Sequence, residues 1–247
     1  MQYVILTAVG VGGATVFGAL IGFIFKKGAT RFGNTILAFA SGIMLAAGVF
    51  TLIIPSVEYA TEGAGAIGVS ITVGGIFTGA VCLTILDKLL PHGIESKSGG
   101  GDPCSVILFV LAIAIHNLPE GLAAGVSFGA GNLTDTLMIA GSIALQNIPE
   151  GMVIIPPMLG AGFSPIKTLL IALSTGAVEI IGTLLGYFTI SISRSVLPFA
   201  LSFAGGTMLY VIADDMIPAT HGDGSGHSAT YSMLLGFALM VIFDTVL

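Results

Sequence analysis

Two short segments carry the polar side chains best placed to do chemistry in this sequence. They read HNLPEG at residues 116–121 and QNIPEG at residues 146–151, 30 residues apart, and both lie inside long apolar stretches. Residues three and four apart share one face of a helix. Each segment therefore predicts a polar stripe made of an imidazole or amide, a second amide and a carboxylate.

These stripes are candidate ligands of a metal ion. A third acid, Glu179, lies in the apolar segment LSTGAVEIIGTLLG, and Met44 in SGIMLAA could add a thioether. Buried carboxylates repel one another unless a cation neutralises them. Imidazole with carboxylates suits zinc, iron, cobalt or manganese, whereas an all-oxygen cage suits calcium or magnesium. The candidate ligands are His116, Asn117, Glu120, Gln146, Asn147, Glu150, Glu179 and Met44.

Each motif also contains a proline, Pro119 or Pro149. A proline inside a helix removes one backbone hydrogen bond and bends the chain, which here frees the carbonyl groups of Ile115 and Leu145. Unpaired backbone at membrane depth is tolerated only where it lines protein or a cavity. The prolines therefore predict a widened, oxygen-lined site.

The surrounding chain has the composition of an integral membrane protein. Of its 247 residues, 55% are hydrophobic and only 8% are charged, whereas soluble domains carry about 25% charged residues. The N-terminal apolar run has no basic start and is long enough to span, so we expect it to be retained. Cys82 and Cys104 lack the spacing of a disulfide framework or a zinc site.

Eight apolar stretches reach the ~20 residues that a helix needs to cross the hydrocarbon core. We therefore expect an all-α membrane protein with a single transport domain over residues 1–247. The expected spans are about 3–25, 33–55, 66–90, 104–129, 134–158, 165–190, 196–218 and 229–247.

The basic residues predict the orientation of these spans. The odd-numbered loops hold or adjoin six of the seven Lys and Arg residues, and the even-numbered loops hold only Arg194. By the positive-inside rule the odd loops are cytoplasmic, so both termini are expected to be extracytoplasmic. The six are Lys26, Lys27, Arg31, Lys88, Lys97 and Lys167.

The sequence also contains signs of internal symmetry. The fourth and fifth spans carry the same motif but cross in opposite directions. The second span, FASGIMLAAGVFTLIIPSVEYA, is echoed by FAGGTMLYVIADDMIPATH in the seventh. Inverted repeats of this kind are typical of transporters whose site lies near the midplane of the bilayer.

Other polar residues lie toward the predicted cytoplasmic side. His92, His221, Asp223 and His227 fall in loops, where they either collect metal or belong to solvated glycine-rich segments. Three further acids either line an inner vestibule or are ordinary interfacial residues: Asp87, Asp214 and Asp215.

At these residues the sequence resembles the ZIP family of divalent metal transporters, whose fourth helix carries HNxPEG and whose fifth carries a related xxxPEG motif. The likeness covers essentially the whole chain, including AFASGIMLAAGVF in the second span and the glutamate of the sixth. It implies an eight-helix bundle with both termini outside, and a homodimer.

The resemblance also implies roles for the candidate residues. The primary site, with Met44 near its outer side, would be formed by His116, Glu120, Gln146 and Glu150. A second site sharing Glu120 or Glu150 would be formed by Asn117, Asn147 and Glu179. Gln146 stands where many members have histidine, and Asn147 where some have an acid, so whether one or two metals bind is left open.

We expect a transporter that moves Zn²⁺, and also Fe²⁺, Mn²⁺ or Cd²⁺, into the cytoplasm. The ion is then a substrate, and neither a catalytic cofactor nor a nucleic-acid partner is expected. Two alternatives use the same residues. One is a cation channel, and the other is an intramembrane metallohydrolase, which the absence of an HExxH motif disfavours.

Overall fold

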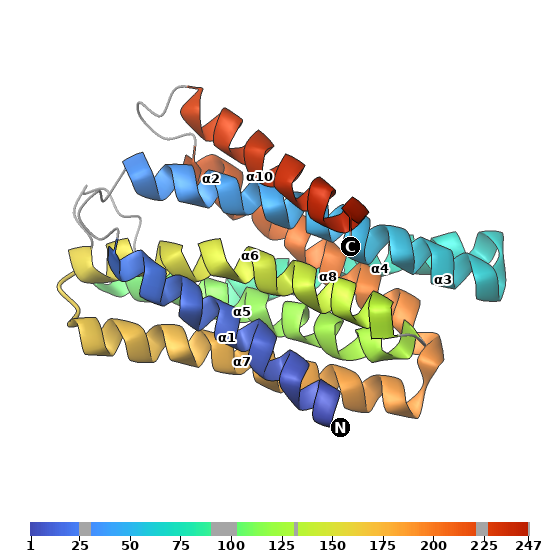
Figure 1. The fold of residues 1–247 in the computed structure, drawn as a ribbon. Coiled ribbons are helices and arrows are strands. Elements are labelled where there is room, and N and C mark those ends of the chain that lie inside the picture. The colour runs from blue at the N-terminus through green and yellow to red at the C-terminus, as the bar shows by residue number, and fades with distance from the viewer. Residues whose placement is uncertain (25–30, 90–102, 131–132, 221–226, 247) are drawn as a thin grey trace.

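The structure is a computed structural model that describes residues 1–24, 31–89, 103–130, 133–220 and 227–246 (Figure 1). The side chains of some residues within its helices, His116 among them, lie outside this description. The described part contains helices and turns but no strand. The elements are α1 (Gln2–Ile24), α2 (Arg31–Ala46), η1 (Ala47–Ile53), α3 (Ile54–Ala64), α4 (Ala66–Leu89), α5 (Pro103–Val126), η2 (Ser127–Ala130), α6 (Leu133–Gly160), α7 (Pro165–Ile192), η3 (Arg194–Val196), α8 (Leu197–Val211), η4 (Ile212–Met216), α9 (Ile217–Thr220) and α10 (Ser228–Val246).

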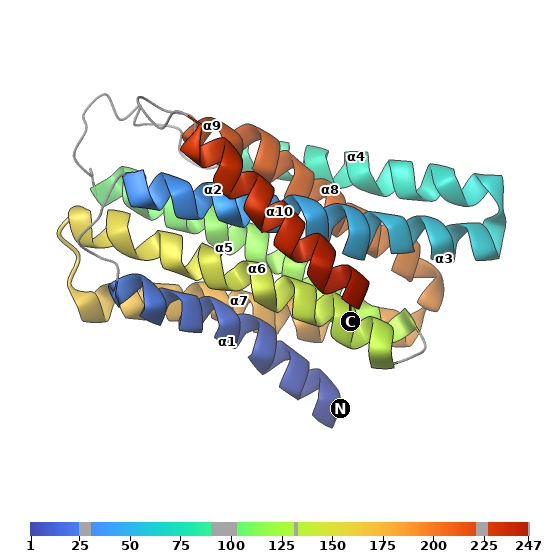
Figure 2. The same cartoon turned by 45° about the horizontal axis from the view of Figure 1, so that its top comes forward.

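Within the described residues, eight helical segments are long and apolar enough to cross a membrane, which confirms the expected number of spans. The second span is a continuous rod of α2, η1 and α3, which α10 crosses in Figure 2. The seventh is formed in the same way by α8, η4 and α9. Many large apolar side chains remain exposed on α1, α4, α7 and α10, as expected of surfaces that face lipid.

The spans run roughly along one direction, so the bundle has two ends (Figure 1). One end, here called the basic end, holds the last residues of α1, α4, α6 and α9 and the first residues of α2, α5, α7 and α10. The other, here called the terminal end, holds the start of α1 and the last turn of α10. Both chain termini therefore lie at one end of the bundle.

Two tight turns show how the sequence ends one span and begins the next. Gly65, with φ of 55°, joins α3 to α4, and Gly162, with φ of 84°, follows α6. Both angles lie in the left-handed region that glycine adopts without strain. Ser164 then caps α7 by accepting a hydrogen bond from the Lys167 N–H, and Pro165 takes the first helical position, where no backbone donor is needed.

The second and seventh spans each contain a wider, π-helical segment, η1 or η4. Here the N–H of Ile54 bonds to the carbonyl of Val49, and that of Ile217 to Ile212, five residues back in both cases. A proline follows each, Pro55 or Pro218. Proline removes an N–H and clashes with the carbonyl four residues back, and a widened turn relieves that clash. Such segments are frequent at functional sites.

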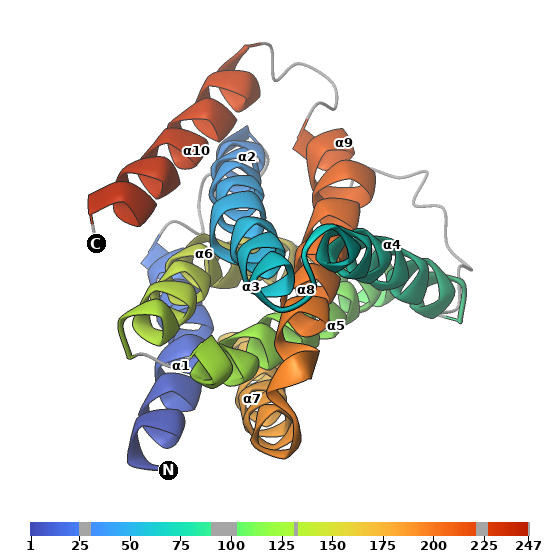
Figure 3. The same ribbon diagram turned by 90° about the vertical axis from the view of Figure 1, so that its right-hand side faces the viewer.

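The helices pack as two groups, which Figure 3 shows end-on. In the site group, α1 packs against α6 and α7, and α5 packs against α7. In the flank group, α2 packs against α10, and α4 packs against α8. The two groups meet mainly where α2 contacts α6 and where α5 contacts α8. Both motif-bearing helices therefore belong to the site group.

The centre of the site group is a backbone contact between α1 and α7. A Cβ added to Gly12 would overlap the carbonyl oxygen of Gly176, and one added to Gly176 would overlap the carbonyl of Gly12. The contact is reciprocal, and the two glycines are 164 residues apart. This is the geometry expected where a two-fold axis passes between two equivalent helices.

The same offset recurs in the contacts around this point. Gly18 of α1 lies against the carbonyl of Ile148 in α6, and Gly182 of α7 lies against that of Leu118 in α5. Gly18 and Gly182 are again 164 residues apart, and Leu118 and Ile148 differ by the 30 residues that separate the two motifs. The α1–α6 contact therefore repeats as the α7–α5 contact.

The flank group obeys a matching relation. Gly236 of α10 lies against the carbonyl of Phe39 in α2, and Gly79 of α4 lies against that of Phe203 in α8. Spans one to three are thus related to spans six to eight, and span four to span five, with opposite directions through the bundle. The expected inverted repeat is confirmed. Residues related by it are called mates below.

Candidate metal site

The polar stripes of the two motifs lie in the interior of the bundle. Asn117, Gln146 and Asn147 are fully buried, Glu120 is 1% exposed and Glu150 is 6% exposed. Both α5 and α6 continue as helices through the prolines of their motifs. Ionisable residues in a membrane protein belong in such an interior, because lipid cannot solvate them.

Glu179 lies between the two motifs on α7. Its Oε1 accepts hydrogen bonds from the Asn117 amide at 2.6 Å and from the Thr15 hydroxyl at 2.7 Å. Its Oε2 accepts one from the Asn147 amide at 2.7 Å. The side chain is fully buried, so three donors from α1, α5 and α6 satisfy one carboxylate.

The two asparagines are held in equivalent ways. Asn117 Nδ2 also donates to the carbonyl of Thr175 at 3.4 Å, and Asn147 Nδ2 to that of Val11 at 3.2 Å. Thr175 and Val11 are mates, 164 residues apart. Both amide nitrogens therefore point toward the α1–α7 crossing.

Other polar atoms of the motifs have no hydrogen-bond partner among the described residues. Seven of the eight such buried side-chain atoms belong to the two motifs. A buried polar group without a partner costs about 1–3 kcal/mol, so their gathering at one place indicates a site for a ligand. The seven are Asn117 Oδ1, both carboxylate oxygens of Glu120, Gln146 Oε1 and Nε2, Asn147 Oδ1 and Glu150 Oε2.

The charges of this site are crowded. Glu150 lies close enough to Glu120 and Glu179 for their charges to interact. Gln146 lies beside Glu120, but no hydrogen bond of acceptable geometry joins the two side chains. Carboxylate and amide oxygens that face one another across two helices suit a cation, which would balance their charge.

No three His, Cys, Asp or Glu side chains in the described part of the chain are grouped closely enough to hold a metal ion by themselves. An ion at this site therefore needs amide oxygens as well as carboxylates. The backbone of His116 lies in α5, one residue before Asn117, but its side chain is outside the described part, so its role as a ligand stays a prediction.

A cavity of about 300 Å³ lies between the site and the basic end. Glu150 and Met44 line it near the motifs, and the exposed Asp214 and Asp215 of η4 line it nearer the basic end. Its other lining residues are Leu37, Phe109, Ile113, Val153, Val211, Met216 and Ala219. Met44 thus shares a cavity wall with one candidate ligand, Glu150.

The terminal end is closed at the equivalent place. The mates of the apolar lining residues are at most 3% exposed, so packed side chains fill the volume that corresponds to the cavity. They are Leu201, Ile139, Ile143, Ala123, Ala47 and Leu52. The mate of Glu150 is Glu120, which does not line the cavity. The structure is therefore open on one side of the site only.

The remaining sequence candidates are distributed as follows. His227 is exposed just before α10, at the basic end. His92, His221 and Asp223 lie outside the described residues, and so does the side chain of Asp87. Sequence reasoning missed Thr15, which is fully buried and bonded to Glu179. The signal that could have found it is the 164-residue offset, because Thr15 is the mate of Glu179.

Comparison with known proteins identifies the group to which the chain is similar. The model of the ZIP Zinc transporter family matches residues 95–244, more than half of the chain. The chain is 39% identical over 202 residues to the zinc transporter GufA of Myxococcus xanthus, covering 79% of each protein. It is 34% identical over 240 residues to the zinc transporter ZIPB of Bordetella bronchiseptica, covering 95% of this chain and 78% of that protein.

The likeness extends to an animal protein. The chain is 30% identical to the zinc transporter ZIP11 of Homo sapiens, covering 94% of this chain and 93% of that protein. Eight spans, an inverted repeat and paired NxPEG motifs around a buried carboxylate accompany these matches. The chain belongs to the ZIP zinc transporter family.

Proposed function

We propose that the chain carries divalent transition-metal ions into the cytoplasm through a site between α5 and α6. The observation that carries the proposal is the set of buried oxygens without partners on these two helices, beside a cavity that leads to the basic end. Glu120 and Glu150 together supply two negative charges, which one divalent cation balances. Such residues in a membrane interior are functional by default.

The direction of transport rests on the distribution of charge. The positive-inside rule assigns the basic end to the cytoplasm and both termini to the outside. An ion at Glu150 then has a route to the cytoplasm through the cavity, past Asp214 and Asp215. The packed mates on the terminal side block the outward route in this conformation, which favours a carrier over an open channel.

The chemistry of the donors supports a permissive site. The candidate primary ligands are His116, Glu120, Gln146 and Glu150, with Met44 on the wall of the same cavity. A single imidazole among oxygen ligands suits several borderline and hard ions. Zn²⁺ is the first proposed substrate, because the relatives are named as zinc transporters, and Fe²⁺, Mn²⁺ and Cd²⁺ are proposed as further substrates.

Transport without catalysis is the role that the relatives' names imply. The HExxH motif of many zinc hydrolases is absent from the sequence. The homodimer remains a prediction that rests on the family resemblance.

Uptake of Zn²⁺ into liposomes that contain the purified protein tests the proposal. Glu120→Gln and Glu150→Gln each remove a charge from the site, and we expect each to lower uptake at least ~10-fold, the loss that even supporting residues of metal sites produce. Glu62→Gln is the matched control, because Glu62 is exposed on α3. Wild-type rates in both site variants would show that the site is assigned wrongly. Saturable uptake with competition among metals distinguishes a carrier from a channel.

A further inference from the structure

The carboxylate of Glu179 differs from the other two glutamates of the site in what it contacts. Both of its oxygens accept hydrogen bonds, from Thr15, Asn117 and Asn147. In contrast, both oxygens of Glu120 and one oxygen of Glu150 have no partner among the described residues. The three acids therefore divide into two that are open to a ligand and one that is engaged by protein donors.

The bonds to Glu179 fix the direction of both asparagine amides. A side-chain amide is planar, with donor nitrogen and acceptor oxygen on opposite branches. Since Nδ2 of Asn117 and of Asn147 points at Glu179, each Oδ1 must point away from it. Those two Oδ1 atoms are buried and have no partner among the described residues. Glu179 thus turns two amide oxygens away from itself, on the helices that carry Glu120 and Glu150.

The pseudo-two-fold arrangement explains why one carboxylate serves two amides. Glu179 and Thr15 are mates, so the axis passes between an acid and a hydroxyl. A carboxylate has two oxygens, and Glu179 offers one to each asparagine. The Thr15 hydroxyl adds a third bond at 2.7 Å. A second acid at position 15 would instead place two like charges side by side.

We propose, building on the proposed function, that Glu179 is a positioning residue and not a metal ligand, and that the site binds one divalent ion. The ligands of that ion include Asn117 Oδ1 and Asn147 Oδ1 together with Glu120 and Glu150. Thr15 holds Glu179 in place. Two ligand carboxylates neutralise one divalent cation, so no second ion is needed to balance them.

The stoichiometry of binding is the first test. The detergent-purified full chain is titrated with Cd²⁺ by calorimetry, and bound metal is counted by mass spectrometry. We expect one ion in the wild type. Glu179→Gln should still bind one, but about 10- to 100-fold more weakly, as when an outer-shell partner of a metal ligand is lost. Two ions in the wild type and one in Glu179→Gln would overturn the inference while leaving the transport proposal intact.

The choice of metal gives a readout that a general loss of packing would not move. In Glu179→Gln, the new NH₂ group faces one asparagine, which must turn its oxygen toward it and away from the ion. Amide oxygen is a hard ligand, so affinity for Mn²⁺ should fall more than affinity for the softer Cd²⁺. An equal loss for both ions would contradict the positioning role.

Thr15 supplies a second, smaller perturbation. Thr15→Val keeps the shape but removes the donor, and it should weaken Mn²⁺ binding in the same direction as Glu179→Gln, while Thr15→Ser should bind like the wild type. Thr183→Val is the matched control: this buried hydroxyl on α7 bonds the backbone carbonyl of Glu179 and not its carboxylate. Equal losses in Thr15→Val and Thr183→Val would overturn the inference. A wild-type chain that binds no divalent ion would overturn the transport proposal itself.

Discussion

Gln146 determines much of the chemical character of the site, because its mate is His116. The two motifs otherwise present the same asparagine and glutamate to the interior of the bundle. The site therefore combines one imidazole with one amide where a symmetric pair would have two nitrogens. An amide oxygen is harder than an imidazole nitrogen, so Gln146 favours Mn²⁺ relative to Zn²⁺.

Gln146→His should therefore shift selectivity toward Zn²⁺. The added imidazole is expected to raise the ratio of Zn²⁺ to Mn²⁺ uptake about tenfold, equivalent to about 1.4 kcal/mol. Competition of the two ions in proteoliposomes measures the ratio. Gln146→Leu serves as the comparison and should lower uptake of both ions. An unchanged ratio in Gln146→His would show that position 146 does not contact the ion.

The residues of the two motifs could be predicted from the sequence, because their spacing and apolar surroundings are local properties. Thr15 could not be. Threonine is common in membrane helices, where it bonds the carbonyl three or four residues back, as Thr175 does. What distinguishes Thr15 is a partner 164 residues away, and only the three-dimensional packing of α1 against α7 brings the two together.

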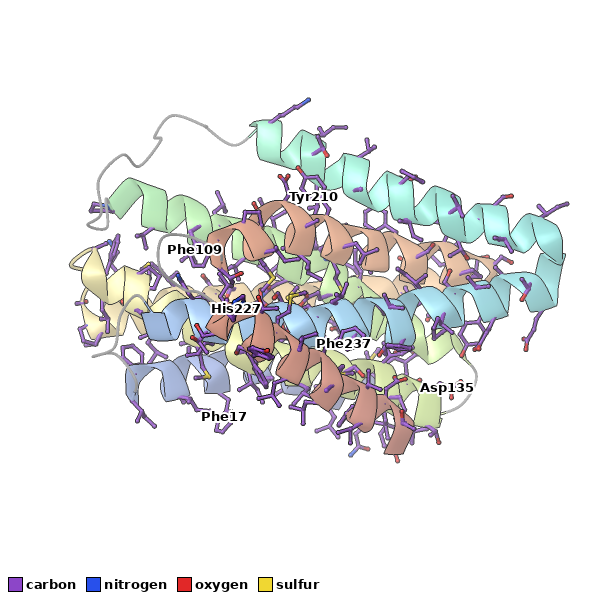
Figure 4. The ribbon with its side chains drawn as sticks, turned by 90° about the horizontal axis from the view of Figure 1, so that it is seen from above. Phe17, Phe109, Asp135, Tyr210, His227 and Phe237 are labelled. Carbon is purple, nitrogen blue, oxygen red and sulfur yellow. The ribbon has the colours of Figure 1, made fainter. Side chains whose placement is uncertain are left out.

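At the scale of elements, polar contacts join the two helix groups in the terminal half of the bundle. Tyr59 of α3 donates to Asp135 of α6 at 2.9 Å, and Thr51 of η1 donates to Ser142 of α6 at 3.2 Å. Asp135 lies at the terminal end, as Figure 4 shows. Both contacts join the second span to the fifth on the side where the mates of the cavity residues are packed.

Tyr59→Phe should therefore favour opening of the terminal end. The lost hydrogen bond is worth about 1 kcal/mol, or roughly a fivefold change in the balance between conformations. Labelling of Ile139→Cys by a membrane-impermeant reagent from outside, with Cys82 and Cys104 replaced, measures the opening.

The matched control for this labelling is Tyr231→Phe, since Tyr231 is exposed on α10 at the other end of the bundle. The control should label at the parent rate. A labelling rate in Tyr59→Phe no higher than in Tyr231→Phe would count against a closing role for the contact with Asp135.

The existence of the eight spans followed from apolar length alone, whereas the π-helical segments did not. The resemblance between the second and seventh spans was visible in the sequence, but hydropathy does not report how backbone hydrogen bonds shift. Pro55 and Pro218 remove a donor at equivalent places, and the helix can respond by bending or by widening. Which response occurs depends on packing against neighbouring spans.

At the scale of the whole molecule, the chain is a multi-pass protein of the cell membrane with inverted repeats and a cavity on one side only. Its two halves have nearly the same contacts but differ in exposure. Val153 lines the cavity, whereas its mate Ala123 is fully buried. Exchanging the conformations of the halves would open the terminal end and close the basic end.

Cysteine labelling tests this exchange. Val153→Cys should react with an impermeant reagent from the basic end, and Ala123→Cys from the terminal end, in each case without Cys82 and Cys104. A condition that raises one rate, such as addition of Zn²⁺, should lower the other, because a single transition changes both. Rates that rise together would indicate a continuous pore instead of alternating access.

The unequal positions of Glu120 and Glu150 have a consequence for the order of events. Glu150 lines the cavity and Glu120 does not, so an ion that departs toward the cytoplasm loses contact with Glu120 first and Glu150 last. In the exchanged conformation the order reverses, and Glu120 is the first carboxylate that an arriving ion meets. Two residues that are chemically identical and related by symmetry thus act at different times, one as receiver and one as releaser.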